Sequence, residues 1–215
     1  MPESDATALV IDDDPEFRNS VGRLLRSVGL DARLFASVPD FVKSERPDGP
    51  TCLVLDVRLP GPSGLDLQCE LGAAGIQIPV IFVTGHGDVP MCAQAMKRGA
   101  IEFLSKPFRD QDLIDAVHLG LARDRARREN ERTLCALRAR FESLTSRERE
   151  IMIHVVRGRP CKLIAGDIGI SEPTVKVHRS NLMHKMNVRT AVELGRIAEK
   201  LNLPSEKTEA TVQHS

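Results

Sequence analysis

Short apolar runs alternate with stretches of helical spacing in the first half of the chain, and this alternation limits the folds open to it. The stretches between the runs place apolar residues three or four positions apart, as helices do. Strands that alternate with helices form a parallel sheet covered on both faces. The near-continuous apolar character of the runs agrees, because such strands are buried on both sides. We therefore predict a doubly wound, five-stranded α/β domain over residues 1–120. Its strands are "ALVI" (8–11), "ARLF" (32–35), "CLVL" (52–55), "VIFV" (80–83) and "IEFL" (101–104), with helical spacing at 17–28, 65–71 and 89–96.

The second half of the chain has a helical pattern throughout. From Asp110 to about Arg140 there is no Pro, and the residues are densely charged, which predicts a long solvated helix with residues 121–140 as a linker. Residues 141–203 predict a small all-α domain of four helices. The polar tail at 204–215 predicts disorder. The four helices are expected at about 146–157, 160–168, 172–186 and 190–201.

Two of these helices carry recognisable start signals. Thr145 precedes Glu148 by three residues, which is the spacing of a capping box. Ser171 stands at the expected N-cap of the third helix. In the first half, Asp14 precedes Pro15 and is expected to cap the first helix.

The zero net charge of the chain conceals a division between its halves. Residues 1–120 contain 11 Lys and Arg against 18 Asp and Glu, whereas residues 121–203 contain 18 against 10. This asymmetry indicates two domains with different partners, and the basic one is the candidate for binding a polyanion. The chain has neither Trp nor Tyr, which argues against a nucleic-acid surface built on stacked aromatic rings.

The sequence shows neither a membrane-spanning segment nor a signal peptide. No apolar run approaches the roughly 20 residues that span a bilayer, and the acidic N-terminus is unlike a signal peptide. We therefore expect a cytoplasmic protein without a membrane partner. The cysteines are scattered with no C-x-x-C pair, so neither a disulfide framework nor a zinc site is indicated, and we expect mostly buried thiols. They are Cys52, Cys69, Cys92, Cys135 and Cys161.

Chemically active side chains follow the predicted strands at their carboxyl ends. Asp12 and Asp13 follow the first strand, Asp56 the third, Thr84 the fourth, and Lys106 the fifth. These ends meet at one edge of a parallel sheet, where ligands bind. Neighbouring carboxylates repel strongly in a partly desolvated crevice, and a hard cation relieves this repulsion. Oxygen-only ligands favour Mg²⁺ or Mn²⁺.

Four segments together resemble the receiver domain of two-component response regulators. They are "VIDDD", "CLVLDVRLPGPSG", "VIFVTGHGD" and "AIEFLSKPF", in that order, and the resemblance covers about residues 6–120. It implies a flavodoxin-like fold. It also implies that Asp56 accepts a phosphoryl group from a phosphohistidine of a sensor kinase. Asp13 and Asp56 would bind Mg²⁺ directly, Asp12 through water, and the backbone carbonyl of Arg58 would complete the protein ligands.

The same resemblance assigns the residues that respond to phosphorylation. Lys106 would pair with a phosphoryl oxygen, and Thr84 would move to hydrogen-bond another. Phe103 is the aromatic partner of this switch, and having no hydroxyl it would act through packing alone. Such a protein catalyses only its own phosphotransfer and dephosphorylation, so we do not expect an enzyme acting on external substrates.

Two other classes of protein share this fold class, but this chain lacks the residues that each of them requires. A dinucleotide-binding domain needs glycines after its first strand, where this chain has three carboxylates. A haloacid-dehalogenase-like phosphatase places a second Asp two residues after its nucleophile. Position 58 is Arg.

Residues 144–198 are similar to the LuxR-type helix-turn-helix of the NarL/FixJ response regulators, most closely at "TVKVHRSNLMHKMNV". In the helix that follows Ser171, the apolar residues Val175, Leu182 and Met186 form one face. A helix that presents basic residues near its N-terminal end suits the major groove of DNA. The resemblance places Lys176, Val177 and Ser180 at base edges, Arg179 nearby, and Thr174 and Lys185 nearer phosphates.

The sequence thus predicts a response regulator that controls transcription. Phosphotransfer to Asp56 would promote homodimerisation and binding to double-stranded promoter DNA, with RNA polymerase as a further partner. Release of the DNA-binding domain by the receiver is a second route that fits the sequence. The alternative function is a phosphorylation-independent DNA-binding regulator whose receiver serves only as a protein-interaction module.

Overall fold

The computed structural model describes residues 6–85 and 89–203. Their contacts divide the chain into two compact units between Glu129 and Asn130. The predicted disorder of the tail at 204–215 concerns residues outside the described ranges.

The first unit contains a parallel sheet whose five strands confirm the predicted ones to within a residue at each end. The strand order is β2-β1-β3-β4-β5. From β1 the chain moves outward to β2 and then returns across β1 to β3, so the order reverses between β1 and β3. In doubly wound sheets this reversal opens a crevice at the carboxyl ends of those two strands. The strands are β1 (Thr7–Ile11), β2 (Asp31–Phe35), β3 (Thr51–Asp56), β4 (Val80–Thr84) and β5 (Glu102–Ser105).

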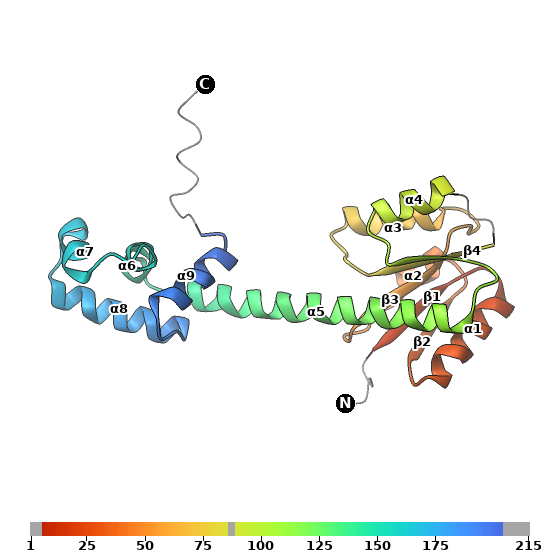
Figure 1. Ribbon diagram of the computed structural model, residues 1–215, viewed down its shortest axis with the longest axis horizontal. Coiled ribbons are helices and arrows are strands. Elements are labelled where there is room, and N and C mark those ends of the chain that lie inside the picture. Colours follow the sequence, from red (N-terminus) through yellow and green to blue (C-terminus); the bar gives the residue numbers. More distant parts are fainter. Residues whose placement is uncertain (1–5, 86–88, 204–215) are drawn as a thin grey trace, which may run out of the picture. The chain divides into compact units, whose positions relative to one another are not determined.

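Helices cover both faces of this sheet (Figure 1). Alternate strand residues such as Val10 and Val54 pack with α1 and α5, whereas Leu53 and Phe82 pack on the opposite face with α2, α3 and α4. Only α2 lacked a sequence prediction, because six residues are too few to show a helical period. The helices are α1 (Pro15–Ser27), α2 (Val38–Lys43), α3 (Gly64–Ala73), α4 (Val89–Lys97) and α5 (Asp110–Glu142).

The start of α1 confirms the predicted role of Asp14. Its carboxylate accepts hydrogen bonds from the backbone N–H groups of Glu16 and Phe17, and Pro15 occupies the first turn. Asp14 therefore caps α1, and its carboxylate has a different role from those of Asp12 and Asp13.

Helix α5 is continuous over 33 residues, as the charged Pro-free stretch predicted. Its first part is anchored to the sheet unit by a fully buried carboxylate, Asp124. That side chain accepts the Thr51 N–H at 2.9 Å and guanidinium groups of Arg127 and Arg128 at 2.6 Å each. Arg128 also donates to the Asp48 carbonyl, so α5 contacts this unit beyond the boundary expected at residue 120. No helix in the described ranges is both long and apolar enough to cross a membrane.

In the described residues, the second unit contains the end of α5 and four further helices, and the bounds of these four confirm the predictions to within one residue. Thr145 and Glu148 form the predicted capping box of α6, and the Ser171 side chain caps α8. The predicted apolar face of α8, Val175, Leu182 and Met186, is fully buried in the core of this unit. The helices are α6 (Ser146–Val156), α7 (Cys161–Ile168), α8 (Glu172–Met186) and α9 (Ala191–Lys200).

The expectation that most cysteines are buried was wrong. Only Cys52 is buried, in the central strand β3, whereas Cys69 and Cys135 are exposed and Cys92 and Cys161 are half-buried. Cys52 alone lies on a strand with both faces covered, while the other four lie on helices, which keep one side open to solvent.

Candidate functional site

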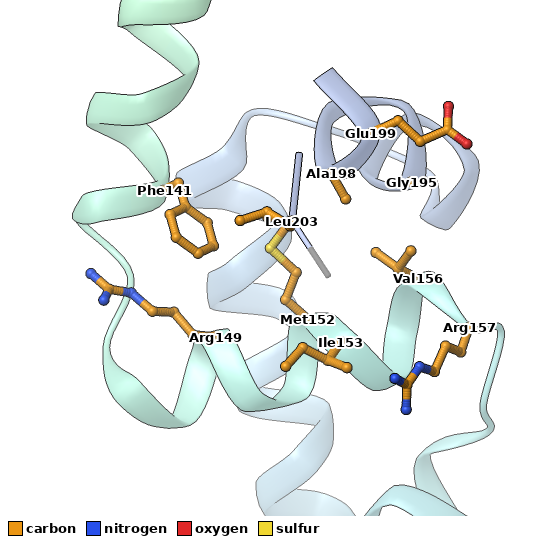
Figure 2. A pocket seen from close by; sticks show the side chains of 10 residues that line it. All are labelled: Phe141, Arg149, Met152, Ile153, Val156, Arg157, Gly195, Ala198, Glu199 and Leu203. Atoms are coloured by element: carbon orange, nitrogen blue, oxygen red, sulfur yellow. The ribbon is translucent and has the colours of Figure 1, made fainter. Parts of the chain in front are cut away.

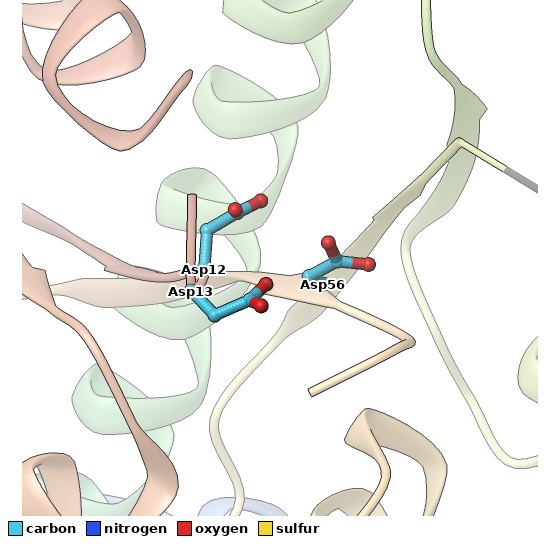
Figure 3. A group of neighbouring side chains, drawn as sticks. All are labelled: Asp12, Asp13 and Asp56. Atoms are coloured by element: carbon cyan, nitrogen blue, oxygen red, sulfur yellow. The ribbon is translucent and has the colours of Figure 1, made fainter. Parts of the chain in front are cut away.

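Three carboxylates gather where β1 and β3 end (Figure 3). Oxygen atoms of Asp12, Asp13 and Asp56 all lie within 4.8 Å of one another. Asp12 is fully buried and Asp56 is nearly so, while Asp13 is exposed. The strand-end prediction is confirmed for these three residues, and the group could hold a metal ion through oxygen ligands alone.

Lys106 joins this cluster from the end of β5. Its Nζ donates to Asp12 Oδ2 at 2.6 Å and to Asp56 Oδ2 at 3.2 Å. Its backbone N–H donates to the Thr84 carbonyl at 2.8 Å, and its peptide bond to Pro107 is cis. One ammonium therefore bridges the buried carboxylates of two neighbouring strands.

The pKa of Asp12 is raised despite its contact with Lys106. Burial raises the pKa of the Asp12 carboxyl, and the opposing effects of Lys106 and of the Asp14 N–H bond at 3.0 Å do not fully offset it. A divalent cation nearby would favour the ionised form. The donor set, which is all oxygen with one exposed member, therefore fits a hard cation such as Mg²⁺.

Asp56 is held from two sides at the end of β3. Its Oδ1 accepts the Arg58 N–H at 3.0 Å, and its Oδ2 accepts from Lys106. Behind it, the first residue of α3 is Gly64, where a Cβ atom would lie 2.3 Å from the Asp56 carbonyl oxygen. Gly64 was not predicted as a site residue, although a Gly directly after the Ser63 N-cap was a signal of close backbone approach.

The predicted switch residues lie on β4, which neighbours β3, and on β5, which lies beyond β4 at the edge of the sheet. Thr84 is fully buried at the end of β4, one position beyond Val83, which pairs with Asp56. Phe103 pairs with Phe82 in the ladder between β4 and β5, and their ring centroids are 6.4 Å apart. Phe103 is half-buried. Thr84 and Phe103 thus share the β4–β5 ladder, and their movement on phosphorylation stays a prediction.

Phe17 is a second residue that the sequence did not single out for the site. Its ring lies under the Lys106 ammonium, with 3.6 Å between Nζ and the ring centroid. Its spacing in the first helix indicated only a core position. The next residue, Arg18, donates to the Asp12 carbonyl oxygen at 2.6 Å. Both residues come from the first turns of α1, so this helix takes part in shaping the cluster.

In the second unit, α8 exposes most of the residues predicted to contact DNA. Val177 is 59% exposed, and the guanidinium of Arg179 lies 3.8 Å from Cys161 Sγ on α7. Lys176 forms an exposed ion pair with Glu172 at 2.8 Å. The exposed residues are Thr174, Lys176, Val177, Arg179 and Ser180.

Lys185 is placed differently from the other five. Its Nζ donates to Glu148 Oε2 at 2.7 Å and to the Ser143 carbonyl at 3.4 Å. A phosphate contact by Lys185 therefore stays a prediction that requires the ammonium to be shared with a buried carboxylate.

An apolar groove of about 380 Å³ lies between α6 and α9 (Figure 2). Met152 and Val156 come from α6, Ala198 from α9, and Phe141 closes the groove from the end of α5. The residues predicted to contact DNA lie on another helix, α8. The rest of the lining is Arg149, Ile153, Arg157, Gly195, Glu199 and Leu203.

Comparison with known proteins identifies both units. The chain matches the model of the response regulator receiver domain over residues 8–118 and that of the bacterial regulatory proteins of the luxR family over residues 142–198. It is 48% identical over 206 residues to nodulation protein W of Bradyrhizobium diazoefficiens, covering 96% of this chain and 91% of that protein. It is 43% identical over 198 residues to the transcriptional regulatory protein FixJ of Azorhizobium caulinodans, covering 92% and 93%.

A solved structure shows the same similarity. The response regulator StyR superposes with a TM-score of 0.84 at 46% sequence identity, covering 91% of this chain and 99% of that chain. The match extends over both units. The chain therefore belongs to the NarL/FixJ family of two-component response regulators, transcriptional regulators that join a receiver domain to a LuxR-type DNA-binding domain.

Proposed function

We propose that Asp56 is the phosphoacceptor of a magnesium-dependent switch that controls promoter binding. A carboxylate oxygen of Asp56 attacks the phosphorus of a phosphohistidine on a sensor kinase. The new P–O bond makes an acyl phosphate, the P–N bond breaks, and the histidine nitrogen keeps the electron pair. The observation that carries this proposal is the convergence of Asp56, the other two carboxylates and Lys106 at the crevice where the strand order reverses.

The metal would be held by Asp13 and Asp56 directly and by Asp12 through water, with the Arg58 carbonyl completing the protein ligands. Bound Mg²⁺, which Mn²⁺ would replace, supplies positive charge that stabilises the transferring phosphoryl group. The exposed position of Asp13 and the fully buried position of Asp12 support the direct role of Asp13 and the water-mediated role of Asp12.

Three residues of this chain would change their contacts when the phosphoryl group on Asp56 adds negative charge. Lys106 exchanges its contact with Asp56 for a phosphoryl oxygen, and Thr84 moves to donate its hydroxyl to another. Phe103 repacks because Thr84 shares the β4–β5 ladder with it. These movements would remodel the face formed by α4 and β5.

Remodelling that face promotes a homodimer, and a two-fold dimer places two α8 helices about one DNA turn apart. The exposed residues of α8 support binding in the major groove. RNA polymerase is the further partner at the promoter. The proposed location is the cytoplasm, where promoter DNA is bound. In this proposal the chain transforms no external substrate and catalyses only its own phosphorylation and dephosphorylation.

Incubation of the full chain with acetyl phosphate and Mg²⁺ tests this function. Intact mass spectrometry should show the addition of one phosphoryl group to the wild type and to the control D115N, which alters an exposed acid on α5. D56N or removal of Mg²⁺ should abolish it. A folded wild type that gains no phosphoryl mass, or gains it equally after D56N, favours the phosphorylation-independent module. Repeated turnover of a small phosphoester would instead indicate a phosphatase.

A further inference from the structure

Among the residues that the structure describes, the ammonium of Lys106 contacts two carboxylates and the face of a ring. Nζ lies 2.6 Å from Asp12 Oδ2, 3.2 Å from Asp56 Oδ2 and 3.6 Å from the centroid of the Phe17 ring. An ammonium has three N–H donors, so each of these described neighbours can receive one of them. The Lys106 side chain is only 21% exposed, and the ring accounts for part of the shielding.

The Phe17 ring is itself held in place. Its backbone N–H is bound by the capping carboxylate of Asp14, which sets the first turn of α1. Its ring meets Phe108 in an edge-to-face arrangement, with centroids 6.0 Å apart and planes at 88°. Phe108 follows Lys106 by two residues, so the segment that carries the ammonium also carries the support for the ring.

A ring differs from a third carboxylate in a way that matters for phosphoryl transfer. The face of an aromatic ring attracts a cation through its quadrupole and leaves the charge of the cation intact. A carboxylate in the same place would compete with the phosphoryl oxygens for the ammonium and would repel them. Phe17 can therefore hold Lys106 while one of its other contacts is exchanged.

From this geometry we propose that Phe17 is a positioning residue for the phosphotransfer reaction. Its ring keeps the Lys106 ammonium inside the crevice while the contact to Asp56 gives way to one with a phosphoryl oxygen. The kinetic part of this proposal rests on the proposed function of Asp56, whereas the contact itself can be tested without phosphorylation.

The contact is tested by the NMR signal of the Lys106 ε-methylene group, assigned by its loss in K106R. The ring current of Phe17 should move this signal upfield in the wild type and in F17Y. In F17L the signal should return toward the position of an exposed lysine. An unshifted signal in the folded wild type would overturn the contact, whatever the outcome of phosphorylation.

The kinetic role is tested by the rate of phosphorylation with acetyl phosphate and Mg²⁺. F17L should lower the rate constant by about two- to fivefold, which corresponds to a partly exposed cation–π contact, and F17Y should restore it. Pentafluorophenylalanine at position 17 keeps the shape of the ring and reverses its quadrupole, so it should behave like F17L even if leucine disturbs the fold. Phosphorylation of all four proteins at one rate would overturn the positioning role. Absence of phosphorylation in the wild type, with the NMR shift present, would instead locate the failure in the proposed function and remove the kinetic role with it.

Discussion

The Nζ atom of Lys185 lies 2.7 Å from Glu148 Oε2, and Glu148 is only 3% exposed. This pair joins α8 to the start of α6, where Glu148 also closes the capping box with Thr145. Burial alone would raise the pKa of Glu148, but the bonds from Lys185 and Thr145 hold that pKa below its ordinary value. Lys185, in the last turn of α8, is therefore part of the scaffold that carries the DNA-contacting face.

Replacing Lys185 by Met should destabilise the second unit, because it leaves the buried carboxylate of Glu148 without its ammonium. We expect a loss of about 1–3 kcal/mol in the free energy of local unfolding. Hydrogen exchange of the α6 and α8 amides, followed by mass spectrometry, measures this loss. The matched control is K176M, which breaks the exposed pair with Glu172 and should cost about 0–1 kcal/mol. Equal losses in the two variants would contradict the scaffold role.

Local patterns were sufficient to predict the strands, most helices and the acidic crevice. The carboxylates of Asp12, Asp13 and Asp56 could be placed together because parallel strand ends meet at one edge. Contacts between residues far apart in the sequence were not predictable in this way. Lys185 and Glu148 are 37 positions apart, and Thr51 and Asp124 are 73 apart.

The sequence also could not assign a site role to a residue whose spacing equally fits a position in the core. Phe17 has the spacing of a core residue, and only the fold brings Lys106 over its ring. The scattered cysteines were expected to be mostly buried, but Cys69 and Cys135 are exposed, because the side of a helix that faces solvent depends on its packing. The role of Gly64 likewise depends on the path of β3 beside it.

The buried carboxylate of Asp124 should make the anchorage of α5 depend on pH. Burial would raise its pKa, but the Thr51 N–H and the two arginines hold that pKa below its ordinary value of 3.8. A carboxyl with a depressed folded pKa contributes stability above its ordinary pKa, and this is lost as the pH falls through the folded pKa. D124N should therefore lower the free energy of unfolding by about 2 kcal/mol at neutral pH.

Urea denaturation followed by circular dichroism measures this effect in the full chain. The difference between D124N and the wild type should shrink as the pH falls below about 4. The control D115N changes an exposed acid on the same helix and should stay within about 0.5 kcal/mol of the wild type at each pH. A D124N difference that does not change with pH would show that the charge of Asp124 is not what anchors α5.

Gly64 should be intolerant of even one added carbon. In G64A the Cβ atom would meet the Asp56 carbonyl oxygen at 2.3 Å and Leu55 Cγ at 3.0 Å, so α3 must shift away from β3. We expect a lower melting temperature together with slower phosphorylation by acetyl phosphate, because the displaced backbone carries Asp56. In G72A, on the same helix, the added carbon meets nothing within 4 Å and should raise helix stability by up to about 1 kcal/mol. Similar behaviour of the two variants would argue against a close approach at Gly64.

The exposed valine of α8 offers the sharpest test of the DNA-contacting face. Val177 is 59% exposed on α8, and Val192 is 68% exposed on α9. Truncating either side chain to Ala should leave the free energy of unfolding within about 0.5 kcal/mol of the wild type, because neither packs in the core.

At a base edge, an apolar side chain contacts the methyl group of thymine. V177A should therefore weaken binding to a preferred site by about 1 kcal/mol, about a fivefold change in Kd, while V192A should bind like the wild type. The preferred site is first selected from random duplex DNA with the phosphorylated wild-type chain, and the affinities are then compared at one fixed salt concentration. Unchanged binding by V177A, or an equal loss in V192A, would remove Val177 from the recognition surface.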